Sequence, residues 1–174
     1  MKKTTIIAIL LSLSTALGLQ AQEYHLGQLV TNPDGSQGVV FYLNEDGTAG
    51  WMVALHDVAA NIPWGLTDEI EGLPHIISPN NDILTSAFTD TDGFSNTMAI
   101  LNHYQSTGYT GQYAAATVDI ANGWYLPAAG QLKMLYVNAI LYEPKLTSVG
   151  EPLGLHPYWS STQESNEKAC FVHF

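Results

Sequence analysis

Positive charge is nearly absent from this chain. Its 174 residues include five Lys, no Arg and sixteen acidic residues, which gives a net charge of −11 at pH 7. Lys2 and Lys3 lie in an N-terminal segment that we expect to be removed, and their loss takes the net charge from −11 to −13. A strongly negative field repels polyanions. The composition therefore excludes nucleic acid, anionic lipid and sulfated polysaccharide as partners, and it leaves proteins and neutral glycans.

Cysteine is almost absent as well. Cys170 is the single cysteine, so an exported form of this chain has no intramolecular disulfide and must be stable through packing alone. Strand alternation places Cys170 on the same face as Val172 and Phe174. We interpret it as a small core residue rather than a reactive thiol.

Patterns typical of metal sites and catalytic sites are missing too. The six histidines show no spacing typical of metal ligands: His25, His56, His75, His103, His156 and His173. Ser160 and Ser161 lack the Gly-x-Ser-x-Gly pattern of a nucleophile elbow. The sequence predicts no metal, no cofactor and no enzymatic activity.

One short motif resembles the start of a calcium loop. Asp90-x-Asp92-Gly93 supplies two carboxylates and a glycine turn, but the position that gives an EF-hand its bidentate Glu is occupied here by Leu101. We interpret the motif as an Asx-turn that leads into a helix.

The N-terminus has the layout of a secretory signal peptide. Lys2 and Lys3 precede an apolar run over residues 6–13, and small residues lead to a predicted cleavage after Ala21. We expect residues 1–21 to be removed, which leaves no membrane span in residues 22–174. About 150 residues suffice for one domain. The mature protein is predicted to be exported to the periplasm, the outer surface or the medium.

Strand composition dominates the first part of the mature chain. Residues 29–30, 38–43 and 50–55 are apolar and rich in β-branched or aromatic side chains. Asp34-Gly35 and Asp46-Gly47 lie between them, and glycine supplies the positive φ that tight turns need. The pattern predicts an antiparallel meander.

A long loop and a helix are predicted next. Residues 56–89 have little periodicity and many Pro, Asn and Asp residues, so we expect irregular structure, with Trp64 holding it to the core. Apolar residues then take helical spacing up to Gly108, which is suited to a helix C-terminus. Ser95 or Asn96 is the expected N-cap. A shorter helical patch follows over residues 112–120.

The last part of the chain predicts a central helix and a hairpin. Trp124-Tyr125-Leu126 is β-prone and is closed by Pro127. Residues 130–142 form the helix, which we expect to stop at Glu143-Pro144. Its buried stripe is predicted to comprise Leu132, Leu135, Tyr136, Ala139 and Ile140. Residues 158–162 and 169–174 have strand composition around a polar turn, which predicts a hairpin.

These C-terminal motifs resemble a known bacterial family. Trp124-Tyr125-Leu126-Pro127, Gln131-Leu132 and Tyr158-Trp159-Ser160-Ser161-Thr162, followed by a closing aromatic-rich strand, are similar to the Lcl C-terminal domain family and to the related major paralogous domains. That family is grouped with the C-type-lectin-like fold, which the formylglycine-generating enzyme also uses.

The resemblance implies a particular fold. It implies an α+β, C-type-lectin-like domain over residues 22–174, with mixed antiparallel sheets, two main helices and long irregular loops. Members of the family commonly have a further strand after the position of Phe174. The predicted domain therefore either lacks its last strand or has an exposed sheet edge.

The resemblance does not transfer an enzymatic or calcium-binding activity. The formylglycine-generating enzymes use a pair of active-site cysteines, whereas this chain has only Cys170. Lectins that bind sugar through calcium use Glu-Pro-Asn and Trp-Asn-Asp motifs. The corresponding residues here are Glu143-Pro144-Lys145 and Trp159-Ser160-Ser161, so the calcium ligands are missing.

The sequence favours recognition over catalysis. Loops rich in Tyr, Trp, Asn, Ser and Gly are typical of adaptable binding surfaces. We expect an exported, non-catalytic module that binds a protein or a neutral glycan, with a structural subunit of a surface assembly such as a pilus or adhesin, and an extracytoplasmic hydrolase, as alternatives. The candidate ligand-binding residues are Trp64, Asp90, Asp92, Trp159 and Ser161, although the two tryptophans also suit a core role.

Overall fold

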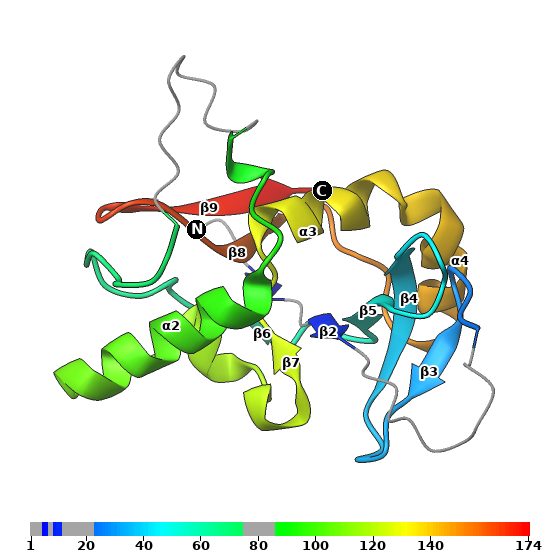
Figure 1. Ribbon diagram of the computed structural model, residues 1–174, viewed down its shortest axis with the longest axis horizontal. Helices are drawn as coiled ribbons and strands as arrows, with labels where there is room; N and C mark the ends of the chain where they lie inside the picture. Colours follow the sequence, from blue (N-terminus) through cyan, green and yellow to red (C-terminus); the bar gives the residue numbers. More distant parts are fainter. Residues whose placement is uncertain (1–4, 7–8, 12–22, 75–85) are drawn as a thin grey trace.

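The computed structural model describes residues 5–6, 9–11, 23–74 and 86–174, and its ribbon is shown in Figure 1. The strands are β1 (Thr5–Ile6), β2 (Ile9–Leu11), β3 (Leu29–Thr31), β4 (Gln37–Leu43), β5 (Gly50–Ala54), β6 (Ala59–Ala60), β7 (Trp124–Tyr125), β8 (Pro157–Ser165) and β9 (Lys168–His173). The helices are α2 (Gly93–Thr107), α3 (Ala129–Val137) and α4 (Ala139–Val149), with 3₁₀ turns at Ala114–Thr117 and Ile120–Asn122. The predicted α+β class is confirmed.

The strands form two small sheets. One has the order β3-β4-β5-β2-β7, and the other has the order β6-β1-β8-β9. Neighbouring strands are antiparallel except where β1 pairs with β8 in parallel. The predicted meander is therefore confirmed as β3-β4-β5, and the predicted C-terminal hairpin is confirmed as β8-β9.

The two turns of the meander have the predicted chemistry. Gly35 and Gly47 have φ values of 88° and 70°, in the left-handed region. Asp34 Oδ1 accepts a hydrogen bond from the Ser36 N–H at 2.9 Å, and Asp46 Oδ1 accepts one from the Thr48 N–H at 3.0 Å. Each aspartate thus closes an Asx-turn around a glycine that carries the positive φ.

Strand β4 separates the two hydrophobic cores. Val39 and Phe41 belong to the core that contains residues of α3 and α4, whereas Val40, on the opposite face, belongs to the core that contains residues of α2. Alternate residues of a strand point to opposite sides, so a strand that is buried on both sides is apolar throughout. Figure 1 shows α2 and α4 on opposite sides of the molecule, with α3 between them at the top of the view.

Helix α2 ends where the sequence predicts and begins earlier. Gly108 follows its last residue with a φ of 70°, as expected for a C-terminal glycine. The predicted N-cap at Ser95 or Asn96 is wrong, because Asp92 caps the helix by accepting a hydrogen bond from the Ser95 N–H at 3.0 Å. Asn96 instead lies in the first turn with its side chain directed to Asp90.

The central helix begins as predicted but does not end as predicted. Ala128 precedes α3 in extended conformation, and the Gln131 side chain reaches back to accept from the Ala128 N–H at 3.0 Å. The helix is then interrupted at Asn138, whose side-chain amide donates to the Phe41 carbonyl at 2.9 Å. The predicted stop at Pro144 is wrong, since Pro144 lies inside α4, which continues to Val149.

The interruption also changes which residues are buried. Leu132 and Leu135 lie in the core as predicted, but Tyr136 and Ile140 are 57% and 83% exposed. The stripe was predicted for one continuous helix, and the break at Asn138 shifts the angular phase of Ile140, which follows it. Tyr136 lies before the break, on the exposed side of α3. Tyr142 and Leu146 are the fully buried residues of α4.

The remaining expectations concern the loop and the two ends of the chain. Between residues 56 and 74 the loop contains only β6, and Trp64 is 7% exposed and held in the core as predicted. Residues 75–85 and the predicted cleavage position at Ala21 lie outside the described residues. Residues 5–6 and 9–11, which belong to the predicted signal peptide, pair as strands in both sheets.

Candidate functional site

Asp90 lies at the centre of a buried polar network. Its side chain is 9% exposed, and Oδ2 accepts hydrogen bonds from Asn96 Nδ2 at 2.8 Å and from Thr162 Oγ1 at 2.7 Å. Oδ1 accepts from the Asp92 N–H at 3.2 Å. A buried carboxylate is costly unless it has such donors. The three contacts therefore hold Asp90 in place between α2 and β8.

The same network supplies partners to the first turn of α3. Thr162 Oγ1 accepts from the Ala129 N–H at 2.9 Å, and the Asp90 carbonyl accepts from the Gly130 N–H at 2.8 Å. Gln131 Oε1 also accepts from the Gly93 N–H at 3.2 Å, and its Nε2 donates to the Tyr125 hydroxyl at 2.9 Å. The starts of α2 and α3 are thereby fixed to each other and to β8.

The five predicted ligand-binding residues gather around β8 and the start of α2, but few of them reach the surface. Trp64 Nε1 donates to the Ser160 carbonyl at 2.7 Å inside the core. Trp159 is half-buried and donates through Nε1 to the Ile62 carbonyl at 3.0 Å. Ser161 is fully buried. Among the five, only Asp92 is exposed and only Trp159 is partly so, and a role in ligand binding stays a prediction for them all.

Serine and histidine side chains do not form a catalytic pair among the described residues. Ser160 Oγ donates to the Cys170 carbonyl at 2.8 Å, and Ser161 Oγ has no hydrogen-bond partner in the described chain. Within the described ranges, no hydrogen bond joins a serine hydroxyl to a histidine ring.

Two histidines lie beside aspartates at the surface. His103 Nε2 is 3.4 Å from Asp68 Oδ2, and His156 Nε2 is 3.5 Å from Asp57 Oδ2. Burial raises the pKa of the Asp57 carboxyl, against the lowering effect of the neighbouring His156. In the part of the chain that the structure describes, no group of three or more His, Cys, Asp or Glu side chains could hold a metal ion.

An open groove lies along α2. We call it the α2 surface, and it is lined by Glu71, Phe94, Ser95, Met98, Ala99, Asn102, His103 and Ser106. Phe94 and Met98 are 44% and 36% exposed although both are large apolar residues. The Phe94 ring makes an edge contact with Tyr125, with a centroid separation of 5.9 Å. This contact orients Phe94 while leaving much of the ring exposed.

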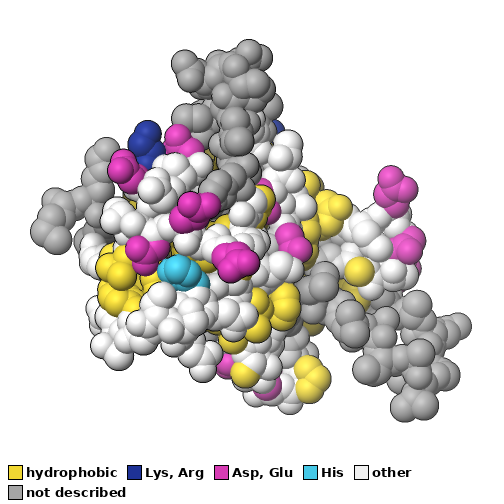
Figure 2. Space-filling model, turned by 60° about the vertical axis from the view of Figure 1, so that its left-hand side comes forward, with side chains coloured by type: hydrophobic (Ala, Val, Ile, Leu, Met, Phe, Trp, Pro, Cys, Tyr) yellow, Lys and Arg dark blue, Asp and Glu magenta, His cyan; other side chains and the backbone are white. Residues whose placement is uncertain are grey.

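Acidic side chains outnumber basic ones on the surface, as the sequence composition predicts. Figure 2 shows acidic side chains spread between apolar patches on the face it presents, with little Lys or Arg. A surface of this kind favours neutral or basic ligands.

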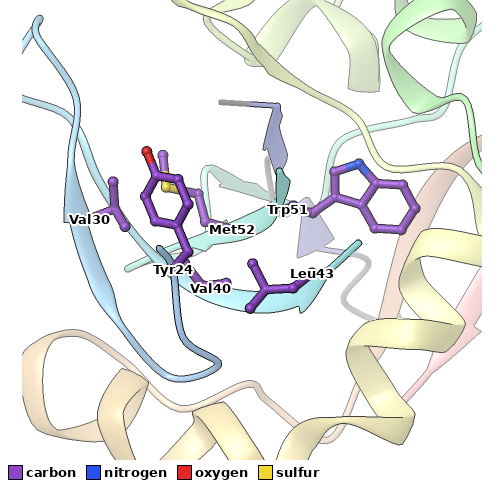
Figure 3. A pocket seen from close by; sticks show the side chains of 7 residues that line it. Tyr24, Val30, Val40, Leu43, Trp51 and Met52 are labelled. Carbon is purple, nitrogen blue, oxygen red and sulfur yellow. The ribbon is translucent and has the colours of Figure 1, made fainter. Parts of the chain in front are cut away.

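A second, smaller hollow lies on the meander. Its lining side chains come from β3, β4, β5 and the segment before them: Tyr24, Val30, Val40, Leu43, Trp51 and Met52. Figure 3 shows Tyr24, Val30 and Met52 close together, whereas the Trp51 ring points away from them. Trp51 is stacked on Tyr42, with a centroid separation of 4.3 Å. The hollow is apolar and too small to hold more than a short side chain.

Sequence reasoning missed the α2 surface. It predicted the helix, but it did not consider Phe94, Met98 or His103 as ligand contacts. The available signal was the row Phe94, Met98 and Asn102, whose i, i+4 spacing places an aromatic, a flexible apolar and an amide side chain on one face.

Comparison of the chain with protein-family models, with curated proteins and with solved structures gives no match. Within the described residues, no helix is long and apolar enough to cross a membrane.

Proposed function

We propose that this chain is an exported, non-catalytic recognition module of the C-type-lectin-like class, which binds a protein or a neutral glycan at the bacterial cell surface or in the periplasm. The α2 surface is the observation that carries the proposal. Phe94 and Met98 offer apolar contact area beside the hydrogen-bonding groups of Ser95, Asn102 and His103. Exposed aromatic and methionine side chains next to polar groups are typical of binding surfaces.

The internal hydrogen bonds support recognition rather than chemistry. Asp90, the most buried of the described aspartates, already accepts from Asp92, Asn96 and Thr162. A carboxylate held by three donors serves to position the backbone that surrounds it. The network thus makes a rigid support on which α2 presents its outer face.

The fold assignment rests on the order of the elements. An early meander, a long irregular loop, a helix, the Trp124–Pro127 segment, a second helical region and a terminal hairpin agree with what the sequence resemblance implies. The irregular loop over residues 56–74 lies beside α2, through the 3.4 Å contact of Asp68 with His103 and the hydrogen bond from the Leu66 N–H to the Tyr104 hydroxyl at 2.7 Å. Irregular loops held on a rigid scaffold are common sites of recognition.

Binding measurements with matched variants test the proposal. The mature chain starting at Gln22 is screened on a glycan array and against purified envelope proteins. A ligand found in this way is then titrated with the double variant Phe94→Ala, Met98→Ala. We expect binding at least about tenfold weaker, because two apolar contacts of roughly 1 kcal/mol each are removed.

The control variant removes a similar amount of exposed apolar side chain from a surface outside α2. Val137 and Ile140 are 64% and 83% exposed at the junction of α3 and α4. The double variant Val137→Ala, Ile140→Ala should bind like the parent chain. Equal binding by the α2 variant and the parent, or an equal loss in both double variants, would contradict the assignment of the α2 surface.

A further inference from the structure

The N-terminal apolar segment supplies an interior strand to each of the two sheets. β2 lies between β5 and β7, with Leu10 opposite Met52 on one side and opposite Trp124 on the other. β1 lies between β6 and β8, with Thr5 opposite Ala60 and Tyr158. Residues 5–6 and 9–11 therefore pair with strands that are otherwise far apart in the sequence.

Two of the strands are attached to their sheets only through this segment. β7 has β2 as its only neighbour, and β6 has β1 as its only neighbour, in the sheet orders of the described strands. The residues that flank β2 are buried, with Met52, Val53, Trp124 and Tyr125 all below 7% exposure. Without an occupant, β5 and β7 present unpaired backbone N–H and C=O groups to a largely apolar seam.

The sequence predicts that this occupant is cut off during export. Residues 5–11 lie inside the predicted signal peptide, which ends at Ala21. The seam between β5 and β7 then loses its central strand, whereas β3, β4 and β5 keep their own pairing. The mature chain is left with a slot that is bordered by strand edges on both sides.

We infer that the seam between β5 and β7 is a strand-acceptor site, and that in the mature protein it binds an extended, uncharged or basic apolar segment supplied by a partner protein. The inference rests on the proposed export, because cleavage is what opens the slot. β2 shows what kind of segment the seam accepts. Its residues Ile9, Leu10 and Leu11 are apolar, and the strand runs antiparallel to both neighbours. Backbone hydrogen bonds supply affinity in this mode of recognition, and pockets for alternate side chains supply specificity.

The charge of the molecule restricts the partner further. With a net charge of −11 for the full chain, basic residues that flank an inserted strand are attracted and acidic ones are repelled. The leader itself has this pattern, with Lys2 and Lys3 before its apolar run. An apolar strand with basic flanks is thus the expected partner segment, and a neutral glycan does not fit the slot.

A disulfide in the full chain tests the occupancy by β2. Leu10→Cys and Met52→Cys are introduced together in a Cys170→Ala background. Residues directly opposite in an antiparallel pair lie within disulfide range. We expect the bond to form under mild oxidation. The control pairs Leu10→Cys with Val53→Cys, whose side chain lies on the opposite face of the strand, and it should stay reduced.

Cleavage then tests the acceptor site. This experiment uses the chain without the cysteine substitutions. A protease site is inserted between Ala21 and Gln22, so that the N-terminal segment can be cut off after folding. We expect the fragment to stay bound through gel filtration and to exchange with a synthetic peptide spanning Lys3 to Ser12. The same peptide with Leu10→Pro should bind at least tenfold more weakly, because proline removes a ladder donor.

The outcomes separate this inference from the proposed function. A cleaved chain that releases the fragment, keeps its circular dichroism spectrum and thermal midpoint, and binds neither peptide overturns the acceptor site. Equal binding of both peptides also overturns it, because strand pairing is then not the mode of contact. Loss of ligand binding at the α2 surface leaves these results unchanged, since that surface lies on the outer face of α2.

Discussion

At the residue scale, Thr162 illustrates how a small side chain can hold several elements together. Its hydroxyl donates to Asp90 at 2.7 Å and accepts from the Ala129 N–H at 2.9 Å, and the residue is fully buried. One oxygen atom thus satisfies both a buried carboxylate and a helix N-terminus.

Thr162→Val should destabilise the domain by about 2–4 kcal/mol. Valine has nearly the shape of threonine, but it leaves Asp90 with one donor fewer and the Ala129 N–H without its acceptor, and each such loss costs about 1–3 kcal/mol. Denaturant titration measures the change. Thr147→Val, at an exposed position of α4, is the matched control and should change the stability by less than about 0.5 kcal/mol. A similar change in both variants would refute the role of the Thr162 hydroxyl.

Cys170 should react slowly with thiol reagents. Burial raises the pKa of its thiol from 9.0 to about 11, with Glu164 and Asp90 adding to the effect. A shift of this size lowers the thiolate fraction near pH 8 by about 100-fold. The rate of alkylation, followed by mass spectrometry from pH 7 to pH 10, measures this. Chain unfolded in guanidinium should react at an ordinary rate, and equal rates in folded and unfolded chain would contradict the prediction.

At the element scale, short local patterns specify turns and helix ends, and contacts with distant residues determine how the elements continue. The turn at Gly47 is local, since Asp46 and Thr48 bond within it. The break between α3 and α4 is not local, because Asn138 bonds to Phe41, which is remote in the sequence.

Gly47→Ala should destabilise the domain by about 1–2 kcal/mol. Gly47 has a φ of 70°, and nothing lies within 4 Å of an added Cβ, so the cost comes from backbone strain alone. Gly47→Asn should cost less, because asparagine tolerates the left-handed region better than alanine. Thermal and denaturant unfolding of the two variants compare them. Equal stability of the alanine variant and the parent would mean that the turn has another conformation in solution.

At the scale of the whole molecule, burial raises the pKa of several tyrosines and of the Cys170 thiol. The tyrosines are Tyr125, Tyr142 and Tyr158, and their pKa values lie above the ordinary value of 10.0. For each group the folded state favours the uncharged form. The associated stability is complete below the unfolded-state pKa and is lost as the pH rises above it.

The domain should therefore unfold in alkali. The free energy of unfolding should be nearly constant from pH 7 to about pH 8.5. It should then fall above about pH 10, by up to about 1.4 kcal/mol per pH unit for each tyrosine that ionises only in the unfolded chain. Urea titrations at pH 7, 8.5 and 10.5 test this. Cys170→Ala should remove only the part of the loss that begins near pH 9. A midpoint that is unchanged at pH 10.5 would contradict the burial of these tyrosines.

The sequence alone determined the local features of this protein. The Asp-Gly corners, Gly108 after α2, the start of α3 and the two strands of the terminal hairpin follow from backbone preferences and side-chain spacing within a few residues. The same is true of the negative charge and of the absence of a disulfide, because both are properties of composition.

The tertiary structure alone decided which side chains the candidate sites bring together and where the N-terminal segment pairs. Asp90 and Ser161 are hidden because contacts with distant segments cover them, whereas Phe94 and Met98 are exposed because no described element packs over the outer face of α2. Periodicity shows that a residue lies on a face, but only the neighbouring elements determine whether that face is covered. The apolar N-terminal segment likewise has one composition whether it enters a membrane or a sheet, and only the structure shows that β2 pairs with β5 and β7.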